Sequence, residues 1–241
     1  MVAFELNPHG ELMSVTPGGP LRDRPQDWLV WHMTHVANLN SIAQLGEIRS
    51  ASQGPPNVNI ANPGVKDRRR SVVVNPDSKY PQGVSVSDHV PFYFAARSPM
   101  QYAIAQGHQN FEDGNDSLVF LGVTLGTIIE AGLTWCASDR NASLATAAFT
   151  SDMNGLGSFI DYSLMLERQW ASTDQDLDRS SRRAAEFLVL SSIPVSEISL
   201  LVVKDPTMLA LATEAFTNVS GNRQYVEGPG FYFARKESDE S

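Results

Sequence analysis

The sequence is poor in cysteine, since Cys136 is the only one among 241 residues. An intramolecular disulfide and a metal site built from several cysteines are therefore excluded, and this composition is typical of a reducing compartment. No apolar run approaches the roughly 20 residues that a membrane-spanning helix needs. Residues 1–20 also lack the basic segment and apolar run of a secretory signal. We therefore expect a cytoplasmic protein without a membrane-bound part.

Positive charge is also scarce. The 18 Lys and Arg are outnumbered by 27 Asp and Glu, which gives a net charge of −9. A general nucleic-acid coat protein is therefore disfavoured, because non-specific binding depends on neutralising phosphates. The basic residues nevertheless gather at 66–70 (KDRRR) and 179–183 (RSSRR), and the acidic ones at 172–178 and 237–241. A local basic patch can still guide a nucleic-acid strand.

Four common catalytic motifs are missing: G-x-G-x-x-G after a strand, G-x-x-x-x-G-K-[ST], H-E-x-x-H and G-x-S-x-G. A Rossmann dehydrogenase, a P-loop NTPase, a zincin and an α/β-hydrolase are therefore disfavoured. His32 and His35 also make a poor metal pair, because an H-x-x-H spacing at the end of a strand directs the two side chains to opposite faces. No nearby cysteine or acidic pair completes the ligand set. We predict no metal site.

What is present indicates one mixed domain. The hydrophobic fraction is 42% and the charged fraction is 19%, which is an ordinary globular balance for a chain of this length. Apolar β-type runs predict strands at 28–32, 90–96, 117–125, 186–192 and 198–203. Helical spacing and end signals predict helices at 39–45, 99–106, 138–149 and 206–216, and residues 223–236 resemble a hairpin. The sequence therefore predicts an α+β fold without regular βαβ alternation.

Three segments lack such periodicity. Residues 1–26 contain PGGP and RDRP, which is typical of a flexible N-terminal arm. Residues 237–241 (ESDES) form an acidic tail, so a single domain is predicted over 27–236. Residues 50–90 are rich in Gly, Pro, Asn and Ser, and a loop of that length inside a compact domain is usually functional or disordered.

Two segments carry side chains suited to a nicotinamide nucleotide. In WHMT (31–34), His32 and Thr34 share one face of a strand and could hydrogen-bond the amide and ribose. A strand-end histidine satisfied by backbone is the simpler explanation of this motif alone. In VPFYFAARSPMQYAI (90–104), Tyr93 and Tyr102 could stack on a flat nicotinamide ring, although aromatic residues more often belong to a core.

A third segment, RRAAEFLVL (182–190), places Glu186 at the start of an apolar strand. A carboxylate at the rim of such a strand is costly unless it has a hydrogen-bond or charge partner. Carboxylates of this kind are common in catalysis, although a solvent-facing glutamate is an equally good explanation of this motif alone.

Together these segments resemble the ADP-ribosyltransferases of the diphtheria-toxin and poly-ADP-ribose-polymerase type. Those enzymes share a W-H-G-[ST] strand, a G-x-Y-F-A…S-x-x-x-Y segment and a later strand with a catalytic glutamate. The motifs H-x-T-H-x-x-N-L-x-x-I…G (32–46), KDRR, VPFYFAARSPM and AEFLV resemble more closely the DarT family of toxins, which modify single-stranded DNA. WCASDRNA (135–142) and GFYFARK are also similar to that family, so the resemblance covers residues 28–236.

The resemblance implies an ADP-ribosyltransferase fold with a central, antiparallel-rich split sheet and flanking helices. It implies transfer of ADP-ribose from NAD to a base in single-stranded DNA, thymidine rather than guanosine, which blocks replication. Departure of nicotinamide leaves an oxocarbenium-like sugar, and a thymine ring nitrogen needs a general base to become a nucleophile. Residues 50–90 would then cover the NAD.

The resemblance also implies roles for individual residues. The catalytic residues would be Glu186, as the base that also orients the ribose, and Arg69, with Arg68 or Arg70 as alternatives in that role. The remaining site residues are implied as follows: His32, Thr34, Asn38, Tyr93 and Tyr102 for NAD; and Lys66, Arg68, Arg70, Arg182, Arg183 and Asn141 for DNA.

The expected partner besides DNA is a macrodomain antitoxin of the DarG type that removes ADP-ribose, and the chain is expected to be a monomer. Two positions depart from related sequences: Met33 replaces the glycine of the wider superfamily, and Asn141 stands where some DarT members carry a histidine. Two alternatives stay open. One is a mono-ADP-ribosyltransferase or NAD glycohydrolase acting on protein, RNA or water, and the other is a non-catalytic binding module on the same scaffold.

Overall fold

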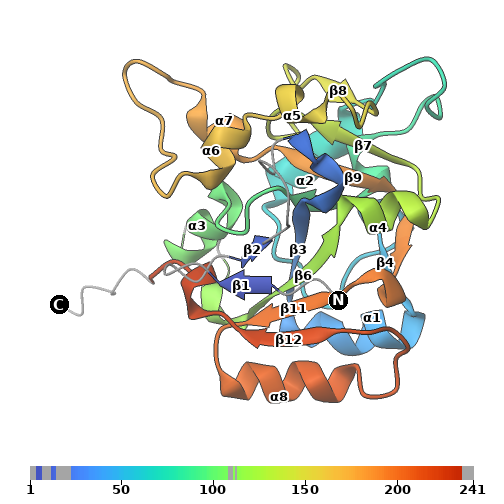
Figure 1. The fold of residues 1–241 in the computed structure, drawn as a ribbon, viewed down its shortest axis with the longest axis vertical. Coiled ribbons are helices and arrows are strands. Elements are labelled where there is room, and N and C mark those ends of the chain that lie inside the picture. The colour runs from blue at the N-terminus through green and yellow to red at the C-terminus, as the bar shows by residue number, and fades with distance from the viewer. Residues whose placement is uncertain (1–3, 7–11, 15–22, 108–110, 112, 235–241) are drawn as a thin grey trace.

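The computed structural model describes residues 4–6, 12–14, 23–107, 111 and 113–234. At its centre is an eight-stranded sheet in the order β12-β11-β6-β3-β5-β9-β7-β8 (Figure 1). β11 and β12 are parallel, and all other neighbouring pairs in this sheet are antiparallel. The strands are β3 (Leu29–His35), β5 (His89–Tyr93), β6 (Leu118–Thr124), β7 (Trp135–Ser138), β8 (Phe149–Thr150), β9 (Glu186–Leu190), β11 (Leu200–Val203) and β12 (Gln224–Glu227). The predicted α+β, antiparallel-rich architecture is confirmed.

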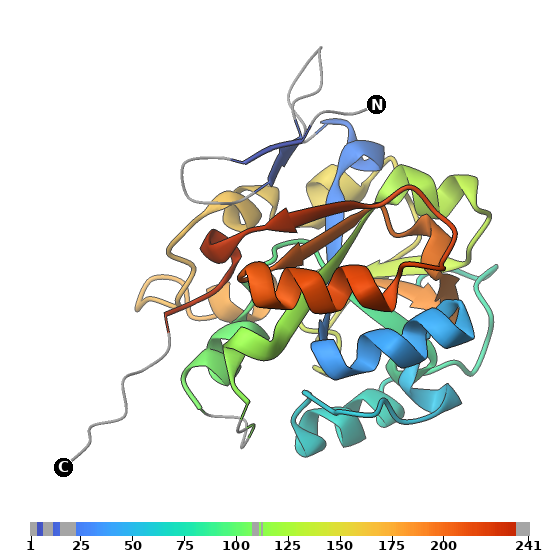
Figure 2. The ribbon, with the colours of Figure 1, turned by 90° about the horizontal axis from the view of Figure 1, so that it is seen from below.

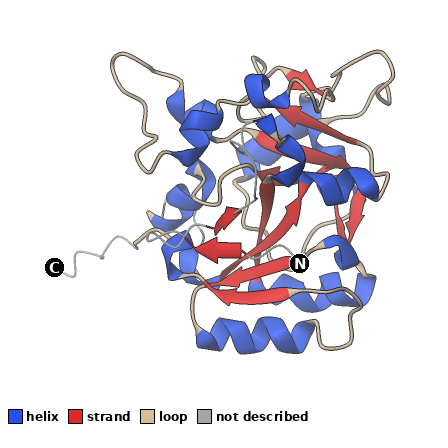
Figure 3. Cartoon of the chain, in the orientation of Figure 1, coloured by secondary structure: helices blue, strands red, loops and turns tan. Residues whose placement is uncertain are grey.

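Both faces of this sheet are covered (Figure 3). Alternate residues of β3 enter different parts of the core, Val30 on one face and Trp31 on the other. This alternation is what a strand between two packed layers requires. Two short strand pairs lie outside the main sheet, β1 (Phe4–Leu6) with β2 (Leu12–Ser14) and β4 (Glu47–Arg49) with β10 (Ser192–Pro194).

The helices begin and end at the expected signals. α1 (Leu39–Leu45) ends at Gly46, whose φ of 71° suits a residue without a side chain. The Ser98 and Asp205 side chains accept backbone N–H bonds at the starts of α3 (Pro99–Ala105) and α8 (Pro206–Ala215). α1 and α8 lie next to each other on one side of the sheet (Figure 2). The other helices are α2 (Pro63–Ser71), α4 (Leu125–Glu130), α5 (Leu156–Phe159), α6 (Tyr162–Leu166) and α7 (Arg179–Arg183).

Two predicted elements are wrong. Residues 138–149 form turns and short strands rather than a helix, because Asp139 and Asn141 side chains accept hydrogen bonds from the Ala148 and Ser143 amides. Such local bonds compete with helix formation. The predicted 223–236 hairpin is also absent over residues 223–234, the part of this segment that the structure describes. There, β12 pairs with β11, and the chain continues into a 3-10 turn that buries Phe231 against Trp31.

The long 50–90 segment is more ordered than its composition predicts. It contains α2 and two 3-10 turns, at Ala51–Gln53 and Val86–Asp88. Much of the predicted N-terminal arm and all of the acidic tail lie outside the described residues; the described part of the arm includes β1 and β2. Among the described residues, no helix is long and apolar enough to cross a membrane.

The sheet is split between β3 and β5. β3 pairs with β6 at seven positions but with β5 only at Trp31↔Tyr93. Strands that share one ladder position diverge on either side of it, so side chains rather than backbone bonds must fill the space between them. The split brings the middle of β3 and the start of β9 to one cavity.

Candidate active site

A cavity of about 460 Å³ opens at the split in the sheet. Its walls come from β3, β5, α1, α2, the start of α3 and the segment that precedes α2. Glu186 belongs to this lining although it lies more than 80 residues from the other polar groups except Asn141. The cavity therefore unites all three sequence segments in which we predicted site residues.

Glu186 is the most buried charge in this cavity, with 1% of its surface exposed. Arg69 Nη1 donates to both of its carboxylate oxygens, at 3.0 Å to Oε1 and 2.7 Å to Oε2. The Ala142 amide donates a further bond of 3.1 Å to Oε1. A buried carboxylate requires such partners, because removing it from water costs several kcal/mol. Oε1 accepts two of these bonds and Oε2 only one, which leaves Oε2 the oxygen with more free acceptor capacity.

Sequence reasoning missed the Ala142 amide, because a backbone donor has no signature in residue type. Its position follows from the turns that replace the predicted helix at 138–149. Ser138 fixes the backbone at the start of β9, since its hydroxyl accepts a hydrogen bond from the Glu186 amide at 3.1 Å.

His32 spans the split. Its Nδ1 lies 2.9 Å from the carbonyl oxygen of Pro91, so Nδ1 must carry the proton and donate. Burial lowers the pKa of His32 below its ordinary value, which keeps the ring neutral near pH 7 and leaves Nε2 as an acceptor. Pro91 has no N–H to donate, and at this position of β5 the strand makes no ladder bond to β3 that would need one.

Thr34 and Asn38 also line the cavity, but the Asn38 amide is already used. Its Nδ2 donates to Thr34 Oγ1 at 3.0 Å and to the Val58 carbonyl at 2.9 Å, and its Oδ1 accepts from the Val58 amide at 2.8 Å. Asn38 therefore fastens the segment before α2 to β3. Although Asn38 precedes α1, its side chain makes no cap hydrogen bond to that helix.

The two predicted tyrosines lie in different places. Tyr93 lines the cavity, pairs with Glu186 in the β5–β9 ladder and donates its hydroxyl to Met100 Sδ at 3.4 Å. Burial, together with the Glu186 charge, raises the Tyr93 pKa, so this hydroxyl stays protonated. Tyr102 is 42% exposed, contacts Trp170 and Phe233 and does not line the cavity. The structure therefore does not bring Tyr102 to the predicted NAD site.

The basic residues of α2 divide between two sides of the helix. Lys66 and Arg69 line the cavity, whereas Arg68 and Arg70 are exposed. Arg70 pairs with Asp67 at 3.0 Å, but no described carboxylate pairs with Arg68. Arg69 Nη2 is buried and has no hydrogen-bond partner among the described residues, so it offers a donor for an anionic oxygen.

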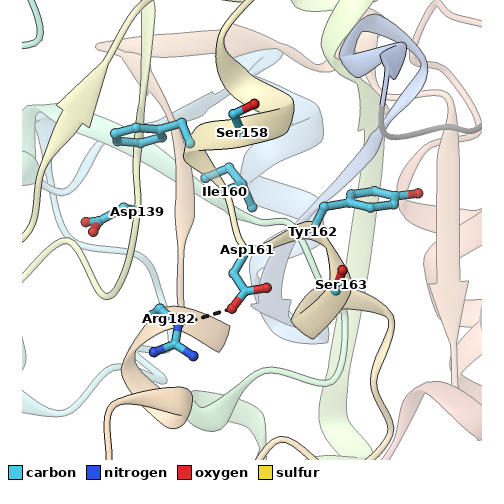
Figure 4. A pocket seen from close by; sticks show the side chains of 8 residues that line it. Asp139, Ser158, Ile160, Asp161, Tyr162, Ser163 and Arg182 are labelled. Carbon is cyan, nitrogen blue, oxygen red and sulfur yellow. Dashed lines mark hydrogen bonds and ion pairs between the residues drawn. The ribbon is translucent and has the colours of Figure 1, made fainter. Parts of the chain in front are cut away.

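The second basic cluster is neutralised within the protein. Arg182 bonds the carboxylates of Asp161, Asp176 and Asp178. Figure 4 shows its guanidinium turned toward Asp161 in a smaller cavity of about 290 Å³. The residues lining this second cavity are Asp139, Ser158, Phe159, Ile160, Asp161, Tyr162, Ser163 and Arg182.

Arg183 is almost fully buried. It donates to the carbonyl oxygens of Leu164, Met165 and Glu167 at 2.6–2.9 Å. Neither Arg182 nor Arg183 is placed to contact a DNA phosphate without giving up these partners, so the structure does not support the prediction for either residue.

Asn141 does reach the main cavity. Its Oδ1 accepts from the amide and hydroxyl of Ser143, at 2.9 and 2.8 Å, and its Nδ2 makes no hydrogen bond within the described part of the chain. No group of three potential metal ligands occurs in the described part of the chain.

Comparison with known proteins shows to which family the chain belongs. Residues 31–233 match the family described as ssDNA thymidine ADP-ribosyltransferase, DarT. The chain belongs to the DarT family. A DNA ADP-ribosyl transferase of Mycobacterium tuberculosis is 45% identical over 216 residues, which cover 90% of this chain and 94% of that protein.

Solved DarT structures share the fold. Thermus sp. 2.9 DarT in complex with ADP-ribosylated ssDNA superposes with a TM-score of 0.79 at 25% identity, covering 87% of this chain and 98% of that one. The same DarT in complex with NAD+ gives a TM-score of 0.73 at 25% identity, with 87% and 99% covered. The predicted family, fold class and NAD-dependent transferase class are therefore confirmed.

Proposed function

We propose that this protein transfers ADP-ribose from NAD to thymidine in single-stranded DNA and acts as a toxin that blocks replication. The observation that carries this proposal is the buried Glu186 carboxylate, which Arg69 and the Ala142 amide bind at the cavity in the split sheet. DarT relatives with bound NAD+ and with ADP-ribosylated ssDNA share this fold. The cavity is large enough for part of a dinucleotide, since ligand pockets are commonly about 300–1,000 Å³.

The cavity lining fits NAD. His32 Nε2 is an acceptor for a ribose hydroxyl, and the Thr34 hydroxyl supplies a neighbouring donor. The Tyr93 ring provides a surface for nicotinamide. The unpartnered Arg69 Nη2 suits a pyrophosphate oxygen, and Asn38 acts indirectly by fixing Val58 over the site.

Glu186 has the central chemical role. Departure of nicotinamide with the glycosidic electron pair leaves an oxocarbenium-like ribose. Glu186 Oε2 accepts a hydrogen bond from the ribose and takes the proton from the thymine ring nitrogen as that nitrogen forms the new bond to the sugar. Arg69 keeps the carboxylate oriented, and the net products are ADP-ribosylated DNA, nicotinamide and one proton.

DNA reaches this centre past the exposed side of α2, where Arg68 and Arg70 are available to phosphates and Lys66 lies at the rim of the cavity. A base must leave its stack to enter such a pocket, which favours single-stranded DNA. Asn141 lines the same cavity, and we assign it a contact to the base. We propose residues 27–236 as the catalytic domain of a cytoplasmic monomer whose partner is a macrodomain antitoxin of the DarG type.

Incubation of the protein with NAD and a mixed-sequence single-stranded oligonucleotide, followed by intact-mass analysis, tests the proposal. We expect one ADP-ribose on the oligonucleotide, with a loss of at least about 100-fold in Glu186→Gln because a general base contributes that much or more. Glu197→Gln, in the 3-10 turn Val195–Glu197 outside the cavity, is the control and should retain activity. Nicotinamide release without a DNA adduct would instead point to protein, RNA or water as acceptor. The absence of both the adduct and free nicotinamide would contradict enzymatic activity.

A further inference from the structure

A pair of buried polar rings lies at the wall of the cavity that contains Glu186. His89 opens β5, and Tyr80 comes from the loop between α2 and β5; both are buried. The Tyr80 hydroxyl lies 2.8 Å from His89 Nε2, and His89 Nδ1 lies 2.8 Å from the Ser85 carbonyl oxygen. The two rings are stacked, with centroids 6.0 Å apart and planes 16° from parallel. The proposed mechanism assigns neither residue a role.

The direction of each hydrogen bond in this pair is determined. A carbonyl oxygen only accepts, so His89 Nδ1 carries the proton. Burial lowers the pKa of His89 to about 4, so the ring is neutral at pH 7 and Nε2 accepts from the Tyr80 hydroxyl. Burial also raises the pKa of Tyr80 well above its ordinary value, so its hydroxyl stays protonated and donates. The bonds run in one direction from Tyr80 through His89 to Ser85.

Ser85 connects this chain of bonds to the helix that bears Arg69. None of the residues of α2 is buried, so the core does not hold this helix in place directly. Its end is fixed by backbone pairing instead, since Val86 N donates to Val72 O at 2.9 Å and Val74 N donates to Val84 O at 2.9 Å. The Ser85 carbonyl that His89 binds lies in the middle of this pairing.

The same rings also lie next to the second donor of Glu186. Val74, Tyr80, Val86, Cys136, Ala142 and Leu188 form one buried group, which we call the Tyr80 cluster. Ala142 supplies the amide bonded to Glu186, and Leu188 follows Glu186 by two residues on the same face of β9. The Tyr80 cluster therefore includes parts of both segments that supply a donor to Glu186. Val74 follows the helix that bears Arg69, and Ala142 supplies the amide.

We propose that Tyr80 and His89 are positioning residues, which keep Arg69 and the Ala142 amide in place around the Glu186 carboxylate. His89 also lines the cavity, but both of its ring nitrogens are already hydrogen-bonded, to Tyr80 and Ser85. The two residues therefore act through the ends of the two segments that supply the donors. The inference rests on the proposed function for its kinetic readout only.

Tyr80→Phe tests this inference, because it removes one oxygen and keeps the ring. Tyr232→Phe is a matched control: both tyrosines are 6% exposed, and the Tyr232 hydroxyl donates at 2.8 Å to the Leu118 carbonyl in a different part of the core. We expect Tyr80→Phe to lower kcat per folded molecule by about 10-fold, as small misplacements of catalytic groups do. KM for NAD should change by less than about 3-fold, and Tyr232→Phe should leave kcat unchanged.

The same change in an Arg69→Lys background shows whether the effect passes through Arg69. If it does, Tyr80→Phe lowers kcat by less than about 2-fold there, because coupled residues are not additive. Equal losses in both backgrounds would overturn the part of the inference that passes through Arg69, and equal kcat values for the two Tyr→Phe proteins would overturn it as a whole. If Tyr80→Phe does not fold, His89→Gln takes its place in each comparison.

Amide hydrogen exchange supplies a readout that needs no activity. Tyr80→Phe should speed exchange in residues 69–74 and 139–148, and Tyr232→Phe should not. If the wild type transfers no ADP-ribose, the proposed function fails, and the exchange data alone decide this inference. Unchanged exchange in both segments would then overturn it.

Discussion

His32 and His89 show how two neutral histidines differ in what they offer. Each Nδ1 donates to a backbone carbonyl oxygen, of Pro91 for His32 and of Ser85 for His89. Both rings line the cavity, but His32 Nε2 has no hydrogen-bond partner among the described residues, whereas His89 Nε2 accepts from the Tyr80 hydroxyl. Only His32 is therefore available to a ligand, and His89 contributes to stability.

Protonation of His89 should lower stability in acid. The pKa of His89 is about 4 in the folded protein, against about 6.5 in the unfolded chain. The unfolded chain therefore binds the proton more readily, so stability is complete above about pH 6.5 and is lost as the pH falls toward 4. The loss attributable to His89 is about 3 kcal/mol.

Urea unfolding at pH 7.0, 5.5 and 4.5 measures this loss. His89→Gln, which cannot be protonated, should show a shallower decrease in the free energy of unfolding over this range. His32 adds to the decrease in the same direction, because burial lowers its pKa as well. An identical pH dependence in the wild type and His89→Gln would contradict this prediction.

At the level of elements, α2 and α7 look alike in sequence but differ in charge environment. Arg68 of α2 is exposed and pairs with no described carboxylate, whereas Arg182 of α7 bonds three aspartates. A side chain already surrounded by carboxylates has little remaining attraction for phosphate. DNA should therefore be guided by α2 and not by α7.

Binding of a fluorescent single-stranded oligonucleotide at several salt concentrations checks this difference. Arg68→Ala should reduce the slope of log affinity against log salt by about one, which is the expected effect of one lost phosphate contact. Arg182→Ala should leave this slope unchanged and should lower the melting temperature, because Asp161, Asp176 and Asp178 would then repel one another. A reduced slope for Arg182→Ala would restore α7 as a DNA-binding element.

Local patterns predicted much of the fold because the signals lie within each element. The apolar run of β3, the Gly46 stop of α1 and the Pro99 and Pro206 starts of α3 and α8 are all readable within a few residues. They also placed Glu186 at the start of a strand and His32 beside Thr34 on another. Residue types at the site were therefore predictable.

Partners across the sequence were not predictable from these patterns. Arg69 meets Glu186 over a separation of 117 residues, and the Ala142 amide over 44. Arg182 finds its carboxylates in the loop before α7 and at Asp161, the residue before α6, so a basic run in the sequence forms internal ion pairs in the structure. Tyr102 lies on α3 near the cavity, but its ring packs against Trp170 and Phe233 instead.

For the whole molecule, NAD should act as a stabilising ligand because its proposed site is lined from both sides of the split sheet. A ligand at 100 times its Kd stabilises the folded state by about 2.7 kcal/mol. The two tyrosines make a matched comparison, since Tyr93 lines the cavity and Tyr102 does not.

Thermal unfolding with and without NAD measures this stabilisation. Tyr93→Ala should lose most of the NAD-induced rise in melting temperature, and Tyr102→Ala should keep it. Loss of the rise in Tyr102→Ala alone would contradict the cavity as the NAD site and would return Tyr102 to the predicted role.

The single ladder position between Trp31 and Tyr93 has a consequence for turnover. In the proposed reaction the product is a DNA strand carrying ADP-ribose, which is far bulkier than NAD and must leave the same cavity. Widening the cavity at this boundary breaks few backbone hydrogen bonds, each worth about 1 kcal/mol. Separating β3 from β6 would break a ladder of seven positions. We therefore expect the product to leave at the boundary between β3 and β5, where the fewest backbone hydrogen bonds must break.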